Sequence, residues 1–306
     1  MSASHRSSGR VDDAPTFDLF RTTSDTNNGA DGGSPPLTSQ RWRTGSRQLA
    51  KIATDIRPRE WDVLRSLEKL HFLTTRQIER LHLSPDHYTP LSAIRTARYS
   101  LTRLYDLGLV ERLQRRVGGV RAGSASFVYR LSPLGARLLH HSTRRRSHEP
   151  SLTHLAHVLS VGELVVRLHE AARADHLELL EVQAEPDCWR PIVAPHGGRV
   201  LLKPDLRVTL GVGEHELHWF VEVDRGSEHR PVLLRKCIVY VQAWRGGREA
   251  ASAGVFPRVL WVVPDQPRAE VLEGVSTAVS GAPSGLFVVA TDADAIEALA
   301  GIGGLA

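Results

Sequence analysis

The stretch Leu104-Tyr105-Asp106-Leu107-Gly108-Leu109-Val110-Glu111-Arg112-Leu113 decides the fold of the first half of this 306-residue chain. Before it, the apolar spacing predicts a helix from about residue 91 to residue 107, with a buried stripe of Ile94, Ala97, Leu101 and Leu104. Gly108 can adopt the left-handed conformation that ends many helices. Residues 109–113 then alternate between apolar and polar, which predicts that a strand follows the helix.

The sequence on either side of this helix and strand completes a small domain. Pro58 suits the first turn of a helix, and Thr74 is a good N-cap for a second, shorter helix. After a turn rich in Gly and Arg, residues 127–131 return as a second strand. Three helices followed by a two-stranded hairpin are typical of a winged helix-turn-helix, which we place at residues 46–148. Residues 1–45 have little apolar content, and we expect a disordered tail there.

The sequence of residues 149–306 predicts a second domain that contains both helices and strands. The run Val259-Leu260-Trp261-Val262-Val263 is unbroken and apolar, as in a strand buried on both faces. The other expected elements are helices at 152–174, 228–244, 268–279 and 294–300, and strands at 177–184, 200–210, 216–223 and 285–290. The expected fold class is therefore a two-domain protein of the α+β or α/β type.

The net charge of +5 is distributed unevenly along the chain. Residues 41–150 hold 22 basic and 9 acidic side chains, a net charge of +13, while residues 1–40 and 151–306 carry −2 and −6. Such a basic segment indicates that the protein binds a polyanion. We predict that this partner is double-stranded DNA and that its binding requires no cofactor. The third helix of a winged helix lies in the major groove. The residues predicted to contact DNA are Arg95, Thr96, Arg98, Tyr99, Thr102 and Arg103 on that helix, and Arg112, Arg115, Arg116 and Arg121 in the wing.

Carboxylates gather at two places in the second domain. Lys203-Pro204-Asp205 falls in one expected strand, and Glu222-Val223-Asp224 ends the next, so Asp205 and Glu222 should lie close together. Paired carboxylates are suitable ligands for Mg²⁺ in phosphodiester hydrolysis. His154 and His157 are three residues apart on the preceding helix, but without a third nearby His or Cys they favour a buried, hydrogen-bonded pair. The chain has no P-loop and no GxSxG motif, and its two cysteines, Cys188 and Cys237, exclude a disulfide framework.

The order of one helix, three strands, one helix and one strand, with Pro-Asp and then Glu-x-Asp, resembles the restriction-endonuclease-like core of the PD-(D/E)xK phosphodiesterases. Active members have Lys two residues after the Glu, where this chain has Asp224. The resemblance implies catalytic roles for Asp205 and Glu222, with Lys236 on the following helix as a migrated lysine, and metal binding by Glu163, Asp205, Glu222 and Asp224. The alternative is that Asp224 and Lys236 form a structural salt bridge in an inactive domain, which we favour.

The string Phe220-Val221-Glu222-Val223-Asp224-Arg225-Gly226-Ser227-Glu228 narrows the resemblance further. Together with Leu152-Thr153-His154-Leu155, Pro204-Asp205 and a helix carrying Lys236 and Tyr240, it resembles the replication-relaxation family over roughly residues 55–265. That family commonly has Thr in place of Ser227. Its proteins are associated with plasmids and other mobile elements of Gram-positive bacteria, where they are linked to replication or to relaxation of DNA.

Three functions follow from these patterns. The first is a cytoplasmic DNA-binding accessory protein in replication, relaxation or conjugative DNA processing, with a relaxase, a translocase or replication proteins as partners. The second is a winged-helix transcriptional regulator, and the third is an active Mg²⁺-dependent DNA endonuclease. A homodimer is a further expectation, and no segment is long and apolar enough for membrane insertion.

Overall fold

The computed structural model describes residues 45–83, 89–117, 126–140, 150–193 and 197–301. The predicted tail at 1–45, apart from its last residue, lies outside this range, as does Arg121. Residues 44–306 form one compact unit of mixed α and β structure.

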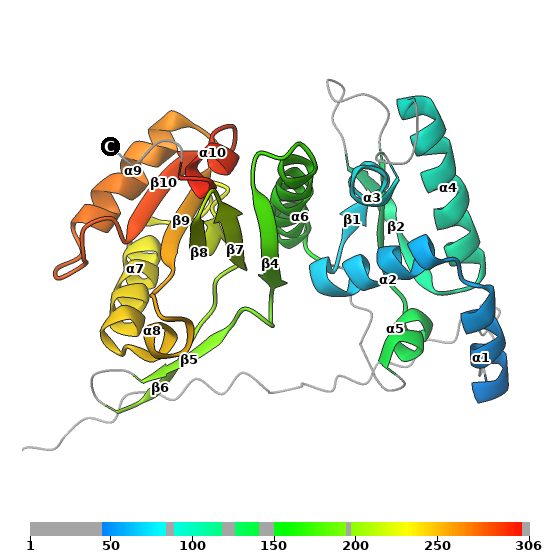
Figure 1. Cartoon of the computed structure of the whole chain (residues 1–306), viewed down its shortest axis with the longest axis horizontal. Helices are drawn as coiled ribbons and strands as arrows, with labels where there is room; N and C mark the ends of the chain where they lie inside the picture. The colour runs from blue at the N-terminus through cyan, green and yellow to red at the C-terminus, as the bar shows by residue number, and fades with distance from the viewer. Residues whose placement is uncertain (1–44, 84–88, 118–125, 141–149, 194–196, 302–306) are drawn as a thin grey trace, which may run out of the picture. The chain divides into compact units, whose positions relative to one another are not determined.

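The first part of this unit consists of helices packed on a small antiparallel sheet (Figure 1). The helices are α1 (Ser46–Asp55), α2 (Pro58–Leu70), α3 (Thr75–His82), α4 (Pro90–Asp106) and α5 (Pro133–His140). The strands β1 (Leu73–Thr74), β2 (Val110–Val117) and β3 (Ser126–Leu131) have the order β1-β3-β2. Local signals explain these boundaries. Pro58 begins α2, the Thr74 hydroxyl accepts the Gln77 N–H at 3.1 Å, and Gly108 follows α4 with a φ of 71°.

The second part is built on a five-stranded mixed sheet with the order β10-β9-β8-β7-β4. Strands β4 (Glu178–Ala184), β7 (Leu206–Val212) and β8 (His215–Val223) are antiparallel, whereas β9 (Arg258–Val263) and β10 (Phe287–Thr291) run parallel to β8. Helices α6 (Leu152–Arg173) and α10 (Ala295–Leu299) pack on one face, and α7 (Arg230–Arg245) and α9 (Gln266–Thr277) pack on the other. The short helix α8 (Arg248–Ala253) follows α7 (Figure 1).

The prediction of a single strand at residues 200–210 is wrong in one respect. Residues 199–202 form β6 (Arg199–Leu202), which pairs with β5 (Arg190–Val193) in a separate two-stranded sheet, and β7 begins only at Leu206. Pro204 lies in the break between them and has no N–H to donate to a sheet ladder. Lys203-Pro204-Asp205 is therefore a connection that enters β7, not part of a strand.

The core extends through both parts of the unit. One cluster joins Leu64, Leu67 and Leu101 of the first part to residues of α6 and of the five-stranded sheet. A smaller cluster packs Phe72, Leu113 and Val128 against three residues of α6, which are Leu155, Val158 and Leu159. Helix α6 thus contributes to the hydrophobic core on both of its sides.

Candidate functional site

The outer face of α4 presents polar side chains to solvent. Four of the residues predicted to contact DNA are exposed there, namely Arg95, Arg98, Tyr99 and Thr102. Within the described part of the chain, neither arginine forms an ion pair. Thr96 is half-buried, and its hydroxyl donates to the carbonyl of Ser92 at 3.0 Å. The exposed set leaves two positive charges and two hydroxyl groups available to a ligand that approaches α4.

A further cation lies beside this face. The Arg57 guanidinium carbon is 5.5 Å from the centre of the Tyr99 ring, within the range of a cation–π contact. The sequence pattern did not single out Arg57, because it precedes α2 and is distant in sequence from α4. Only the packing of α2 against α4 brings its charge to the edge of the predicted DNA-binding face.

Arg103 differs from the prediction that it contacts DNA. Its guanidinium forms an ion pair with the buried Glu60 carboxylate of α2 and donates to the Asp55 carbonyl at 2.6 Å. Glu60 also accepts the Arg57 N–H at 3.0 Å. Arg103 is therefore engaged inside the protein, where its charge offsets that of a carboxylate removed from water.

The predicted wing is described only in part. The Arg112 guanidinium carbon lies 4.3 Å from the centre of the Phe127 ring and 5.3 Å from that of the Tyr105 ring. These contacts join β2, β3 and the last turn of α4 at an exposed position. Arg115 and Arg116 belong to β2, and the register places Arg116 opposite Phe127.

The second group of predicted residues gathers where β7 and β8 meet. Asp205 is buried, and its Oδ2 accepts the Val223 N–H at 2.7 Å. Its Oδ1 lies 3.1 Å from Nε2 of His157, which comes from α6. This hydrogen bond raises the pKa of His157 above its ordinary value, against the opposing effect of burial. Asp205 thus has a partner at each carboxylate oxygen.

Glu222 is buried, and both of its carboxylate oxygens have partners. Its Oε1 accepts the Tyr240 hydroxyl at 2.6 Å, and its Oε2 lies 3.0 Å from the Lys236 ammonium. Burial and the charge of Asp205 raise the pKa of Glu222 to about 7, although Lys236 and Tyr240 act in the opposite direction. The prediction that Lys236 projects from α7 towards the carboxylates agrees with this geometry.

Asp224 has a different partner from the one expected. The prediction of an Asp224–Lys236 salt bridge is wrong, because the buried Asp224 carboxylate pairs with Arg268 of α9. Its other oxygen accepts the Gly226 N–H at 3.1 Å. Lys236 instead lies 2.9 Å from Glu228 and 3.0 Å from Glu222. Arg268 is distant in sequence, so the helix periodicity around Lys236 could not reveal it.

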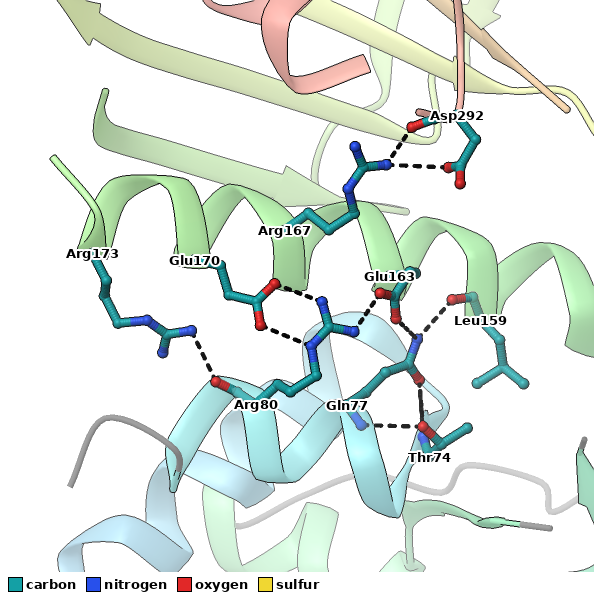
Figure 2. A network of polar contacts seen from close by, with 9 residues as sticks. All are labelled: Thr74, Gln77, Arg80, Leu159, Glu163, Arg167, Glu170, Arg173 and Asp292. Carbon is teal, nitrogen blue, oxygen red and sulfur yellow. Dashed lines mark hydrogen bonds and ion pairs between the residues drawn. The ribbon is translucent and has the colours of Figure 1, made fainter. Parts of the chain in front are cut away.

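Glu163 lies with α3 rather than with the other predicted metal ligands. Figure 2 shows Arg80 of α3 between Glu163 and Glu170 of α6, with ion pairs to both. Gln77 donates to the carbonyl of Leu159 at 2.9 Å and to Glu163 at 3.3 Å. The prediction that Glu163 joins Asp205 and Glu222 is therefore not met, because its carboxylate faces α3.

The donor set does not fit a divalent cation. Each oxygen of Asp205, Glu222 and Asp224 already has a hydrogen-bond or ion-pair partner within the protein. The positive charge next to Glu222 is the Lys236 ammonium. Among the residues that the structure describes, no group of three or more His, Cys, Asp or Glu side chains is arranged to hold a metal ion. Mg²⁺ binds through oxygen ligands, so it could bind these carboxylates only after it had displaced their present hydrogen-bond and ion-pair partners.

His157 and Glu185 complete the surroundings of Asp205. They line a cavity of about 20 Å³ with Asp205 and Lys69, which is room for one water molecule. Burial and the nearby Asp205 charge raise the pKa of Glu185. The expected buried pair of His154 and His157 is wrong, because His154 is exposed and only His157 reaches the carboxylates. Nothing in the sequence singled out Glu185.

Comparison with known proteins gives one match. The model of the replication-relaxation family matches residues 64–259, which include α4, α6 and the carboxylate region. No curated protein and no solved structure matches the chain. Across the described segments, no helix has the length and apolar character needed to cross a membrane. The family match extends over more than half of the sequence and includes Asp205, Glu222 and Asp224, so the chain belongs to the replication-relaxation family.

Proposed function

We propose that this chain is a DNA-binding accessory protein that acts in the replication, relaxation or conjugative processing of a plasmid or other mobile element. Residues 46–148 are the winged helix-turn-helix that binds duplex DNA. Residues 149–306 are a nuclease-like domain that does not cleave DNA. The site of action is the bacterial cytoplasm, and the protein partners are a relaxase, a translocase or replication proteins.

The observation that supports DNA binding is the exposed face of α4. Three helices, α2 to α4, precede the β2–β3 hairpin, which is the order of a winged helix. Arg95, Arg98, Tyr99 and Thr102 face solvent on the third of them, and Arg57 and Arg112 lie at its edges. Arginine and hydroxyl side chains supply the donors that phosphate oxygens and guanine edges accept.

The saturated carboxylates support the absence of cleavage. A metal-dependent nuclease needs carboxylate oxygens that are free to bind the metal. In this chain Val223, His157, Tyr240, Lys236, Gly226 and Arg268 already supply donors to those oxygens. We therefore interpret the domain as a nuclease-like scaffold in which internal hydrogen bonds and ion pairs occupy the carboxylate oxygens that a metal ion would need.

DNA binding is tested with the full chain and a labelled duplex in fluorescence anisotropy. We expect an affinity that falls steeply with salt, because bound phosphates release their counterions. The double variant R95A/R98A should bind at least about tenfold more weakly, with a shallower salt slope. The control is R230A, which removes an exposed arginine at the start of α7 and should leave duplex affinity unchanged.

Two results would contradict the proposal. Equal duplex affinity of R95A/R98A and the wild type would show that DNA does not bind at the exposed face of α4. Mg²⁺-dependent nicking of plasmid DNA by the wild type, lost in both D205A and K236A, would show instead that the domain is an active endonuclease. Both variants need a thermal melt beside the activity assay, since each removes a partner from a buried group.

A further inference from the structure

A pocket of about 350 Å³ opens between β6 and α7, on the side of Glu222 that faces Lys236. Its walls include three apolar side chains and three basic ones, which are Leu201, Val232, Val239, Lys203, Arg235 and Lys236. Its volume is at the small end of the range for ligand pockets in proteins, which begins at roughly 300 Å³. The pocket therefore has room for one small organic ligand and not for a duplex.

The charge of the pocket favours an anion. Lys203 and Arg235 are exposed, and among the described residues neither forms an ion pair. The Lys203 ammonium lies 4.6 Å from the centre of the Trp189 ring, which supports it on one side. Two cations that form no ion pair with a described acidic residue, one directly after β6 and the other on α7, attract a group with more than one negative oxygen.

The acidic group in the pocket does not cancel this charge. Glu222 directs its two oxygens to Tyr240 and Lys236, so neither is directed to the ligand as a free acceptor. Lys236 in turn lies between Glu222 and Glu228, at 3.0 and 2.9 Å, which fixes its position at the base of the pocket. Among the residues that line the pocket, the charge of Lys236 offsets that of Glu222, and Lys203 and Arg235 are the remaining charged side chains.

The walls favour a ligand with a flat or apolar body. Leu201 is 42% exposed and Val232 is 37% exposed, although each lies beside a buried neighbour, Leu202 or Leu233. A ligand that covers these side chains removes apolar surface from water, which is favourable. Inorganic phosphate alone would leave these side chains exposed, and an uncharged ligand would leave the cations without a partner.

From this arrangement we propose that the β6–α7 pocket binds one nucleotide unit, with its phosphate between Lys203 and Arg235 and its base against Leu201, Val232 and Val239. The unit comes either from a free nucleotide or from an unpaired stretch of DNA. The pocket is separate from α4 and shares no residue with the duplex-binding face. It gives the protein a second contact with nucleic acid that recognises unpaired nucleotides.

The test uses the full chain with two probes, dAMP in titration calorimetry and a short labelled oligothymidylate in fluorescence anisotropy. K203E and R235E should each weaken binding by at least about tenfold, since each replaces attraction by repulsion. V232W fills the pocket from an exposed position and should weaken binding without a loss of charge. The matched control is R230E, which reverses an exposed charge on α7 outside the pocket and should bind as the wild type does.

The two probes also identify the source of the nucleotide. Binding of dAMP indicates a free nucleotide as a ligand, and binding of oligothymidylate alone indicates an unpaired strand; either result supports the proposal. No binding of either probe would overturn it, as would an equal loss in R230E and R235E, which would show a general effect of surface charge. R95A/R98A should retain the binding of both probes, so failure of duplex binding and failure of the pocket are distinguishable.

Discussion

Arg98 and Arg103 belong to the same helix, yet their guanidiniums have different surroundings. Arg98 is exposed, while Arg103 reaches the Glu60 carboxylate, which is 1% exposed, and the carbonyl of Asp55. Helix periodicity places both on the polar side of α4 and cannot distinguish them. The difference arises because Glu60 of α2 and the Asp55 carbonyl lie within reach of Arg103, and neither pairs with Arg98.

R103A should therefore lower stability, and R98A should not. Loss of Arg103 leaves the Glu60 carboxylate buried without its charge partner, which should cost about 3 kcal/mol in the free energy of unfolding. R98A removes an exposed side chain and should change this free energy by less than about 0.5 kcal/mol. Urea unfolding followed by circular dichroism measures both. A stable R103A protein would show that Glu60 finds another donor, and E60Q in the R103A background should recover part of the loss.

Glu222 predicts a dependence of stability on pH. Its pKa is raised from an ordinary value of 4.5 to about 7 in the folded protein, mainly by burial. Folding therefore favours the protonated form, and this contribution to stability is complete below pH 4.5 and is lost as the pH rises through about 7. E222Q cannot titrate, so the wild type should lose stability relative to E222Q between pH 4.5 and 7. Thermal melts across this range measure the difference, and parallel pH profiles would contradict the assignment.

Helix α6 is the element that connects the two parts of the described unit. Gly162 allows a close approach, since a Cβ there would lie 3.2 Å from a methyl carbon of Leu73 in β1. At the C-terminal end of α6, Arg173 donates to the carbonyl of Arg80 in α3 (Figure 2) and also to that of Leu81. These bonds satisfy carbonyls at the C-terminus of α3 that have no partner within that helix.

Arg80 is the centre of the contact between α3 and α6. R80A should reduce the free energy of unfolding by about 1 kcal/mol, because Glu163 and Glu170 are 35% and 38% exposed and solvent screens their charge. The control is R65A, which removes an exposed ion pair with Asp62 inside α2 and should change stability by less than about 0.5 kcal/mol. Chemical unfolding compares the two, and equal effects would show that the α3–α6 pairs contribute no more than a surface pair.

Most elements of this fold could be predicted from sequence because their signals are local. Pro58, Thr74 and Gly108 mark helix ends by their own conformational preferences, and the run 259–263 is apolar enough to indicate a strand covered on both faces. The sequence pattern does not predict the separate β5–β6 hairpin. Each of its strands has only four residues, and the two are recognised as strands because they pair with each other. Short strands carry too few residues for an alternating pattern.

The candidate site was predicted less completely, because its residues are defined by partners. The approach of Asp205 to Glu222 follows from adjacent strands, and that of Lys236 follows from the helix after them. The partners His157, Arg268 and Glu60 come from elements that are distant in sequence from Asp205, Asp224 and Arg103. A sequence shows the type of each side chain, but only packing decides which opposite charge it meets.

At the scale of the whole molecule, one hydrophobic cluster joins the first part of the described chain to α6 and the five-stranded sheet. The family match begins at residue 64 and ends at residue 259, so it crosses from the first part into the second without a break. We predict a winged helix at 46–148 and a nuclease-like domain at 149–306. Both regions pack against α6, so we expect a substitution of a buried α6 residue to lower the stability of both regions.

The cluster of Phe72, Leu113 and Val128 on Leu155, Val158 and Leu159 has a consequence for the order of synthesis on the ribosome. Phe72, Leu113 and Val128 are synthesised before α6, so they leave the exit tunnel ahead of it. Until α6 follows, the nascent chain exposes an apolar surface that has no cover. A delay in the emergence of α6 from the tunnel would prolong that exposure and favour capture by chaperones, whereas rapid synthesis of α6 and of the residues after it would cover the surface as soon as the helix emerges.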